Sequence, residues 1–298
     1  MERSIRLSEK LKAIAGFIEM GASVADIGTD HGYLPVYLAQ NELASRIIAS
    51  DISSGSLDSA VRSASKYGVS DKIAFTVAPG LSGVKASDVD TVVIAGVGGE
   101  TIVSILRDAP WTKRQGFRLV LQPQSKLDIL CTFLRNDGYA ISDATLVLDD
   151  GRYYIVILVE GTVQEGASSA VCDCGVDVGA ICQMSNVRDE SQCFVRRSDD
   201  VENPYPCFID KRCSREPSSC FCFFNSPSPC FAEIELLSLL AGKPDPLFDA
   251  FIDQLIAKTR RAVAGIKRSG TANYPGLDKR LEDLINLRAS TEEIHGDS

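Results

Sequence analysis

Residues 26–35 read Asp-Ile-Gly-Thr-Asp-His-Gly-Tyr-Leu-Pro and directly follow a short apolar run. A strand that ends in a glycine turn lets a ligand approach the backbone closely, because glycine has no side chain. Gly28 and Gly32 are the glycines of this predicted turn. Asp51 ends the next apolar run, where a carboxylate can accept two hydrogen bonds from a ribose diol. The layout predicts a nucleotide-type cofactor site; the alternative is a turn that only connects a strand to a helix.

The second residue of the glycine pattern distinguishes between two classes of cofactor. Dinucleotide-binding enzymes normally carry Gly-x-Gly-x-x-Gly here, because the second glycine lets the backbone touch a pyrophosphate. Asp30 stands at that position. A carboxylate would repel a pyrophosphate, whereas it is compatible with the ammonium and sulfonium groups of S-adenosylmethionine (SAM). The sequence therefore favours SAM over a nicotinamide dinucleotide.

Short apolar runs alternate with helical stretches through the first half of the chain, which is typical of a parallel α/β sheet. A leading helix is predicted within residues 5–20, with Ser8 as its cap. Later, two apolar runs flank Asp150-Gly151, a pair typical of a hairpin turn, so the first domain is predicted to cover residues 1–161. The predicted strands lie near residues 23–27, 46–50, 73–78, 91–95, 118–121, 141–148 and 153–159, and the predicted helices near 34–41, 54–67, 100–108 and 126–137.

Residues 162–231 form a cysteine-rich segment without convincing periodicity. It contains nine of the ten cysteines, but no Cys-x-x-Cys pair and no histidine, so it matches known zinc sites poorly and no metal site is predicted. The cysteines are not evidence for disulfides in a cytoplasmic setting either. An irregular or disordered insertion and a locally frameshifted stretch are the alternatives for this segment.

Helical spacing returns at Glu233, and residues 232–298 are predicted to form two antiparallel helices in a short coiled coil. Two clusters of basic residues lie near the ends of the chain. Each is either a face for nucleic acid or an ordinary solvated surface. One cluster comprises Lys258, Arg260, Arg261, Lys267 and Arg268, and the other comprises Arg3, Arg6, Lys10 and Lys12.

The composition is that of an ordinary globular protein, with 45% hydrophobic and 24% charged residues. The net charge of −9 argues against broad, nonspecific coating of nucleic acid, although it leaves room for a local basic face. The sequence shows neither an apolar run long enough to span a membrane nor a signal-peptide pattern, so we expect a cytoplasmic protein.

Three runs of sequence resemble the bacterial TrmK family of tRNA adenine-N1 methyltransferases: Asp26–Pro35, Asp90–Gly99 and Leu121–Pro123. The Ile-Ala-Gly-Val-Gly-Gly end of the second run is the most specific part, because most nucleic-acid amine methyltransferases carry an Asn/Asp-Pro-Pro-aromatic tetrad there. The resemblance covers residues 5–161 strongly and 233–290 loosely. It implies a Rossmann-like, seven-stranded class I methyltransferase sheet with a C-terminal coiled coil that helps to hold tRNA. It also implies SAM as the cofactor, tRNA as the partner and methylation of adenine N1 at position 22.

The resemblance also assigns roles to individual residues. Asp30 and His31 would face the reacting adenine or the methionine moiety, and they are the predicted catalytic residues. Gly96 and its neighbours would let the target base stack near the methyl donor, or would serve only the packing of a tight turn. Tyr33 would stack on a base or cover the sheet edge. The predicted cofactor-binding residues are Asp26, Gly28, Gly32, Asp51, Ile52, Gly80 and Gly96, and the predicted substrate-binding residues are Tyr33, Gly98, Gly99, Lys258 and Arg261.

One position departs from the family pattern. The third strand usually runs into Asp-Gly-Leu, where the Asp accepts a hydrogen bond from the adenine amino group of SAM, but residues 79–81 read Pro-Gly-Leu. Pro79 has no such acceptor. Loss of one charge-assisted hydrogen bond costs about 1.5–3 kcal/mol, which would weaken SAM binding without abolishing it.

The expected chemistry depends mainly on positioning. N1 of neutral adenosine carries a lone pair and no proton, so no base is needed, and orientation alone can lower the barrier by roughly 7–11 kcal/mol. The Asp30 carboxylate would stabilise the positive charge that arrives on the base. His31 would orient Asp30 or accept a proton, or would be a structural residue. The alternative functions are a methyltransferase for a small molecule and a SAM-binding module without catalysis.

Overall fold

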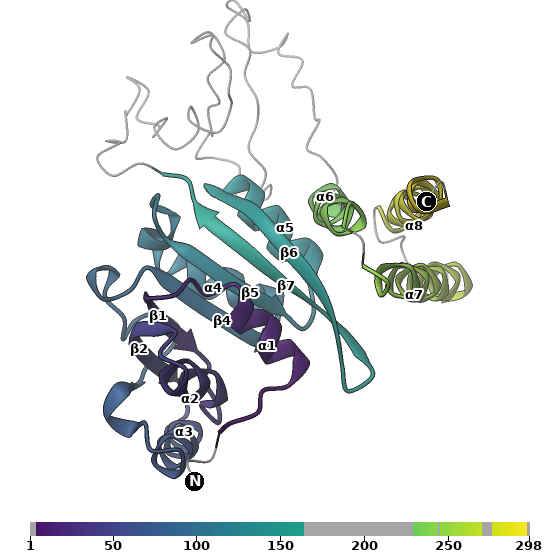
Figure 1. Cartoon of the computed structure of the whole chain (residues 1–298). Helices are drawn as coiled ribbons and strands as arrows, with labels where there is room; N and C mark the ends of the chain where they lie inside the picture. Colours follow the sequence, from purple (N-terminus) through teal and green to yellow (C-terminus); the bar gives the residue numbers. More distant parts are fainter. Residues whose placement is uncertain (1–3, 164–228, 244, 270–275, 297–298) are drawn as a thin grey trace, which may run out of the picture.

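The computed structural model describes residues 4–163, 229–243, 245–269 and 276–296. Its centre is one seven-stranded sheet with the order β3-β2-β1-β4-β5-β7-β6 (Figure 1). The first five strands run parallel, and β7 runs antiparallel to both β5 and β6. The strands are β1 (Ala22–Ile27), β2 (Ala44–Asp51), β3 (Ala74–Val77), β4 (Thr91–Val97), β5 (Arg118–Pro123), β6 (Tyr139–Asp149) and β7 (Arg152–Gly161).

The sheet confirms the predicted Rossmann-like methyltransferase fold, including all seven strands. The last two strands form the expected hairpin. Asp150 and Gly151 connect them with φ values of 48° and 71°, the left-handed conformation that two-residue hairpin turns require. β7 ends at Gly161, where the sequence analysis places the end of the first domain. The division of the chain into domains stays a prediction.

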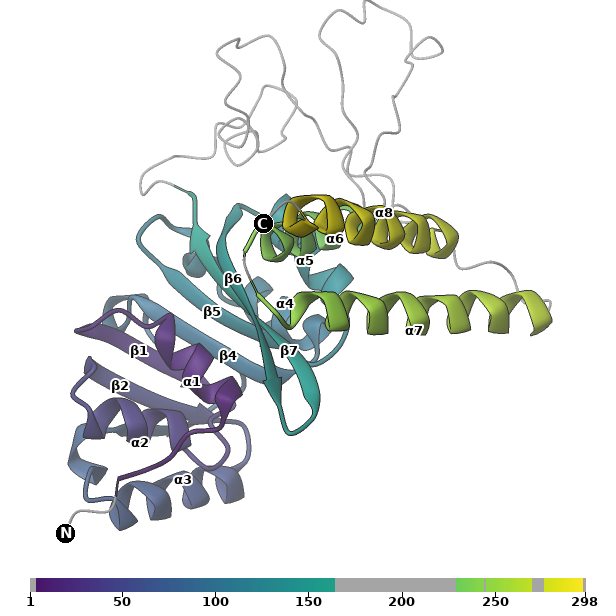
Figure 2. The same cartoon turned by 45° about the vertical axis from the view of Figure 1, so that its right-hand side comes forward.

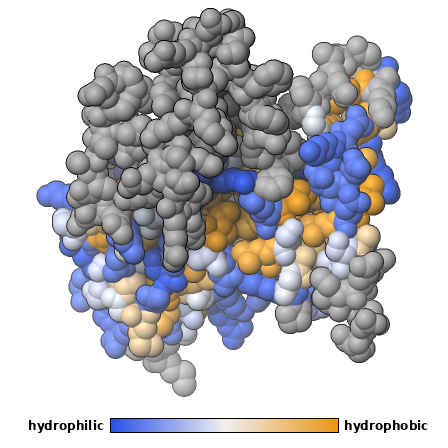
Figure 3. Space-filling model, turned by 90° about the horizontal axis from the view of Figure 1, so that it is seen from above, coloured by the Kyte–Doolittle hydropathy of each residue, from blue (hydrophilic) through white to orange (hydrophobic). Residues whose placement is uncertain are grey.

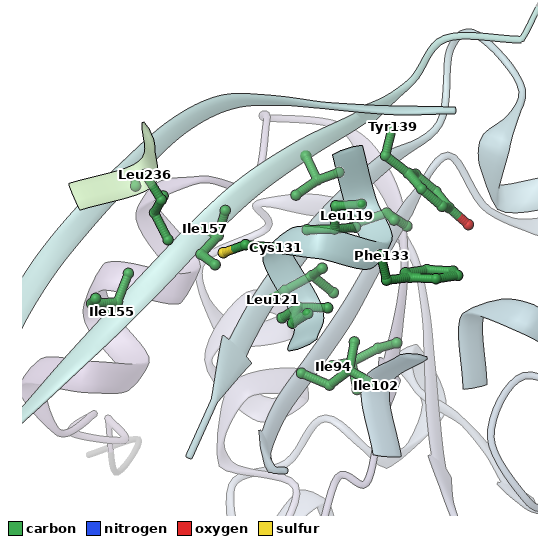
Figure 4. Close-up of a cluster of buried hydrophobic side chains, with 14 of the residues drawn as sticks. Ile94, Ile102, Leu119, Leu121, Cys131, Phe133, Tyr139, Ile155, Ile157 and Leu236 are labelled. Carbon is green, nitrogen blue, oxygen red and sulfur yellow. The ribbon is translucent and has the colours of Figure 1, made fainter. Parts of the chain in front are cut away.

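Helices cover both faces of the sheet (Figure 2). On one face, α1, α2 and α3 bury one apolar cluster against the strands, and on the other face α4 and α5 bury a second cluster. Figure 4 shows the second cluster, in which Ile102 and Phe133 pack against strand residues such as Leu121 and Ile157. The helix bounds are α1 (Glu9–Gly16), α2 (Tyr33–Gln40), α3 (Ser54–Lys66), α4 (Gly99–Arg107) and α5 (Leu127–Asn136).

The leading helix is shorter than predicted. α1 occupies only Glu9–Gly16, and the predicted cap is present, because the Ser8 hydroxyl accepts a hydrogen bond from Leu11 N at 3.4 Å. Before the cap, the backbone is not helical: Ile5 and Leu7 are buried while Arg6 between them is exposed. That alternation has the period of an extended segment. Ile5 and Leu7 therefore belong to an extended segment that precedes the helix.

The C-terminal part contains three helices within the described residues, not the two that were predicted: α6 (Pro229–Ala241), α7 (Phe248–Ser269) and α8 (Leu277–Gly296). α6 packs against α5 and β6, and its Leu236 joins the apolar cluster of the sheet (Figure 4). α7 and α8 run side by side in opposite directions (Figure 2). Their coiled-coil geometry stays a prediction. The cysteine-rich segment falls outside the described residues except at its two ends.

A buried ion pair joins the three C-terminal helices. Arg280 of α8 donates from Nε and Nη2 to the two carboxylate oxygens of Glu233 in α6, both at 2.8 Å. Its Nη1 also donates to the Thr259 hydroxyl of α7 at 2.9 Å. Glu233 is buried, so its charge depends on this guanidinium for compensation.

The surface seen from above carries hydrophobic residues mainly toward the C-terminal helices, with hydrophilic residues around them (Figure 3). Within the described ranges, none of the helices has the length and apolar character needed to cross a membrane.

Replacement of Arg280 by Met should destabilise the protein by about 3–5 kcal/mol, because it leaves the Glu233 carboxylate buried without a partner. Urea unfolding followed by circular dichroism measures this change. Lys279→Met is the matched control, since Lys279 is the exposed neighbour on the same helix. Equal unfolding free energies for the two variants would contradict the assigned role of the ion pair.

Candidate active site

The carboxyl ends of β1, β2 and β4 meet where the strand order changes direction. β1 lies between the other two, so that Ile27 pairs with Ser50 on one side and with Ile94 on the other. Open α/β sheets bind ligands outside the strand ends at such a switch point. The ends of these three strands and the segments that directly follow them contain most of the predicted site residues.

The loop after β1 is held in a left-handed conformation at three positions. Gly28, Asp30 and Gly32 have φ values of 75°, 50° and 67°. The Gly28 N–H donates to the Ser50 carbonyl at 2.8 Å, which fixes the loop against β2. A Cβ on Gly28 would have no atom within 4 Å, whereas a Cβ on Gly32 would lie 2.8 Å from Ala60 Cβ. Gly28 therefore leaves open space beside the backbone, and Gly32 lets α2 approach α3.

Asp51, at the end of β2, connects two loops through its carboxylate. Oδ2 accepts a hydrogen bond from Asp30 N at 3.1 Å, and Oδ1 accepts one from Ser53 N at 2.8 Å. Ser53 in turn caps α3, because its hydroxyl accepts from Ser56 N. The carboxylate is largely buried and held in one orientation, yet each oxygen has a further lone pair. It can therefore also accept hydrogen bonds from a ribose diol.

Two apolar side chains are exposed beside this carboxylate. Ile52 follows Asp51 directly and is 73% exposed, and Val77, which pairs with Asp51 across the β2–β3 ladder, is 57% exposed. Exposed apolar side chains next to a ribose acceptor suit the flat face of an adenine ring. Ile52 was among the predicted cofactor residues. Val77 was missed, although its place at the end of the third strand was a signal that pointed to it.

The loop after β3 contains Pro79, which replaces the Asp of the family pattern. The Pro79 carbonyl accepts a hydrogen bond from Ser82 N at 3.2 Å, and the Pro79 side chain has no polar atom. Gly80 adopts a φ of 52°, and a Cβ there would lie 3.2 Å from the Ile105 side chain. The glycine is thus required by its backbone conformation, and a contact between Gly80 and the cofactor stays a prediction.

Asp26 is the buried carboxyl group of the site. It lies near the end of β1 and accepts a hydrogen bond from the Thr29 hydroxyl at 2.7 Å. Burial raises the pKa of Asp26 to about 6; the Thr29 hydrogen bond opposes this rise and the nearby Asp51 carboxylate adds to it. Asp26 thus stabilises the first loop from inside rather than presenting its carboxylate to solvent.

Asp30, His31 and Tyr33 lie together on the solvent side of the first loop. The side chains of Asp30 and His31 are 69% and 56% exposed, and His31 Nε2 lies 3.7 Å from Asp30 Oδ2. The rings of His31 and Tyr33 stack with their centroids 5.4 Å apart and 21° between their planes. His31 is therefore not a buried structural histidine, and all three side chains can reach a substrate.

The end of β4 and the start of α4 contain three predicted site glycines. Gly96 was predicted to bind the cofactor, and Gly98 and Gly99 were predicted to bind the substrate. Gly96 has a φ of 82°, and its N–H donates to Gln122 Oε1 at 3.1 Å. Gly99 is buried, and a Cβ there would lie 2.2 Å from the Lys126 carbonyl oxygen, so packing alone explains this glycine. Gly98 is only half-buried and remains accessible. Gln122 was missed as a site residue, although a polar residue at the end of a buried strand was the available signal.

The two predicted basic substrate residues lie elsewhere. Lys258 and Arg261 are exposed on α7, which projects from the side of the sheet (Figure 2). The described residues contain no group of three or more His, Cys, Asp or Glu side chains placed to hold a metal ion.

Comparison with known proteins gives three consistent results. The family model described as a methyltransferase domain matches residues 7–157. The tRNA (adenine(22)-N(1))-methyltransferase of Bacillus subtilis is 34% identical over 167 residues, which are 56% of this chain and 70% of that protein. The crystal structure of the B. subtilis M1A22 tRNA methyltransferase TrmK superposes with a TM-score of 0.60 at 24% identity, covering 97% of this chain and 99% of that one.

A second solved structure is that of M. capricolum TrmK in complex with S-adenosyl-homocysteine. It has a TM-score of 0.59 and 19% identity, and it covers 95% of this chain and 98% of that one. At this level of identity the two superpositions establish a shared fold.

The raised pKa of Asp26 predicts a pH dependence of stability. Between about pH 4 and pH 6 the folded protein binds more protons at Asp26 than the unfolded chain does, so the free energy of unfolding falls as the pH rises through this window. The effect of this one group is about 3 kcal/mol. The Asp26→Asn variant should lack this dependence, which urea unfolding at several pH values between 4 and 7 measures.

Asp58→Asn is the control for the loss of one carboxyl group, because Asp58 is exposed on α3. Unfolding free energies of wild type and Asp26→Asn that run parallel across this pH range would contradict the assignment.

Proposed function

Because the chain belongs to the family of bacterial tRNA (adenine(22)-N(1))-methyltransferases, we propose that it transfers a methyl group from SAM to N1 of adenine 22 in tRNA. One observation supports this most directly. The Asp51 carboxylate links the loops after β1 and β2 at the switch point of the sheet, where the family motif and the exposed Ile52 also lie. An adenosine-bearing cofactor fits this arrangement.

The residues of this edge suit each part of SAM. Asp51 would accept hydrogen bonds from the ribose hydroxyls, and Ile52 with Val77 would contact the adenine ring. The open space at Gly28 would admit the methionine portion close to the backbone. SAM supplies an electrophilic methyl group when it is bound. The carboxylates of Asp26 and Asp30 give the loop after β1 a negative charge, which suits the ammonium and sulfonium groups of SAM.

The target adenine would enter between the loop after β1 and the segment that joins β4 to α4. Gly96 and Gly98 carry no side chain, so a flat base would approach their backbone closely, and Gln122 holds the Gly96 backbone in place. N1 has a free lone pair in neutral adenosine, so no residue needs to remove a proton before transfer. Asp30, exposed at the mouth of the site, would stabilise the positive charge that develops on the base, with His31 beside it.

The C-terminal helices would hold the body of the tRNA. Lys258, Arg260, Arg261 and Arg268 are exposed on α7, and no carboxylate of the described residues forms an ion pair with them. The Arg288 guanidinium of α8, by contrast, pairs with Asp249 and Asp253. A row of uncompensated cations on one projecting helix suits phosphate groups, despite the net negative charge of the chain.

Transfer of labelled methyl groups from SAM to unmodified tRNA transcripts tests this function. We expect N1-methyladenosine at position 22 and no label in a transcript that carries guanosine there. The Asp30→Asn variant should lose roughly tenfold to a hundredfold in kcat while it retains SAM binding, because it removes the charge near the reacting base.

Asparagine is the appropriate replacement because Asp30 has a positive φ, which Asn tolerates and Ala does not. An undiminished kcat in the Asp30→Asn variant would show that the Asp30 carboxylate does not stabilise the charge that develops on the base. No labelled RNA, despite measurable SAM binding, would contradict the proposed function itself.

A further inference from the structure

A pocket of about 450 Å³ lies beside the proposed active site, on the outer side of α2 and α3. The extended segment before α1 forms one wall of it. Ile5 N donates to Gln40 Oε1 at 3.0 Å, and Gln40 Nε2 donates to the Tyr67 carbonyl at 3.3 Å, so the segment is fastened to both helices. The lining residues are Ser4, Ile5, Arg6, Tyr33, Ser63, Lys66 and Tyr67.

Two cations of this pocket have no compensating carboxylate among the described residues. Neither Arg6 nor Lys66 forms an ion pair with any Asp or Glu of the described chain. Some other basic residues of the same domain are paired; Arg46, for example, binds Asp88 at 2.9 Å. Two uncompensated cations in one pocket suit an anionic group, and a phosphate in particular.

Aromatic side chains connect this pocket to the proposed catalytic loop. Tyr33 lines the pocket and also stacks on His31, which lies next to Asp30. Its ring is 44% exposed, so it has surface available for a further ring. On the opposite wall, Lys66 Nζ lies 5.2 Å from the centroid of the Tyr67 ring. The pocket thus combines cations with an exposed aromatic ring directly beside the site of methyl transfer.

We propose that this pocket binds the RNA chain next to the target adenine, with Arg6 and Lys66 contacting backbone phosphate and Tyr33 stacking on the neighbouring base. The inference rests on the proposed function. Adenine N1 is a Watson–Crick edge atom, so the target base must leave its pairing and its stack before it can react. The nucleotide beside it then loses a stacking partner. An aromatic ring with cations at hand replaces that partner and holds the strand.

The charge variant Arg6→Gln/Lys66→Gln tests the phosphate contacts. The dissociation constant for tRNA should rise about tenfold at low salt, and the slope of log K against log salt should become shallower by about 1 to 2, because two phosphate contacts are lost. Affinity for S-adenosylhomocysteine should not change. Lys85→Gln is the control: Lys85 is an exposed lysine that precedes the short helix η2 (Ala86–Asp88) and does not line the pocket.

A pair of Tyr33 variants tests the stacking contact. Tyr33→Phe keeps the ring and should retain the wild-type KM for tRNA, whereas Tyr33→Leu should raise it fivefold or more. Unchanged tRNA affinity and an unchanged salt slope in the charge variant would contradict the proposed role of the pocket. The proposed function would still hold if the wild type methylates tRNA. If the wild type binds no tRNA, both the proposed role of the pocket and the proposed function are wrong. Equal losses in Lys85→Gln and the charge variant would indicate only a general charge effect and would also overturn the pocket.

Discussion

The proposed site depends on two hydrogen bonds that the Asp51 carboxylate accepts. One oxygen accepts from the backbone of Asp30 in the loop after β1, and the other accepts from Ser53 at the start of α3. A single buried side chain therefore sets the position of two loops from different strands. It also holds Asp30 in a left-handed conformation that few residues tolerate, which turns the Asp30 and His31 side chains outward. In the proposed site, the same carboxylate would therefore determine both the position of the cofactor and the access of the substrate.

Much of this arrangement was predictable from the sequence, because local patterns report local structure. Alternation of apolar runs with helical spacing predicted the strands and helices around the sheet, and Asp150-Gly151 predicted its final hairpin. The carboxyl ends of parallel strands meet at one edge, so the placement of Gly28 and Asp51 beside each other followed from their positions at the ends of consecutive strands. These features need no knowledge of how distant helices pack.

Other features were not predictable, because they depend on contacts between distant segments. Ile5 and Leu7 belong to an extended segment whose place is set by its contact with α2, which the adjoining helical pattern obscured. Gly99 is a glycine because the Lys126 carbonyl approaches it, a fact of packing that no motif states. Lys66 becomes a candidate RNA contact only once the N-terminal segment closes a pocket over α3.

Calorimetric titration with S-adenosylhomocysteine, comparing wild type with Asp51→Asn, tests the central claim most directly. The account predicts that the wild type binds and that the variant binds at least tenfold more weakly, because charge-assisted hydrogen bonds to the ribose worth about 1.5–3 kcal/mol are lost. A parallel unfolding curve establishes that the variant is folded. Equal affinity in a folded Asp51→Asn variant would contradict the claim that this carboxylate organises the cofactor site.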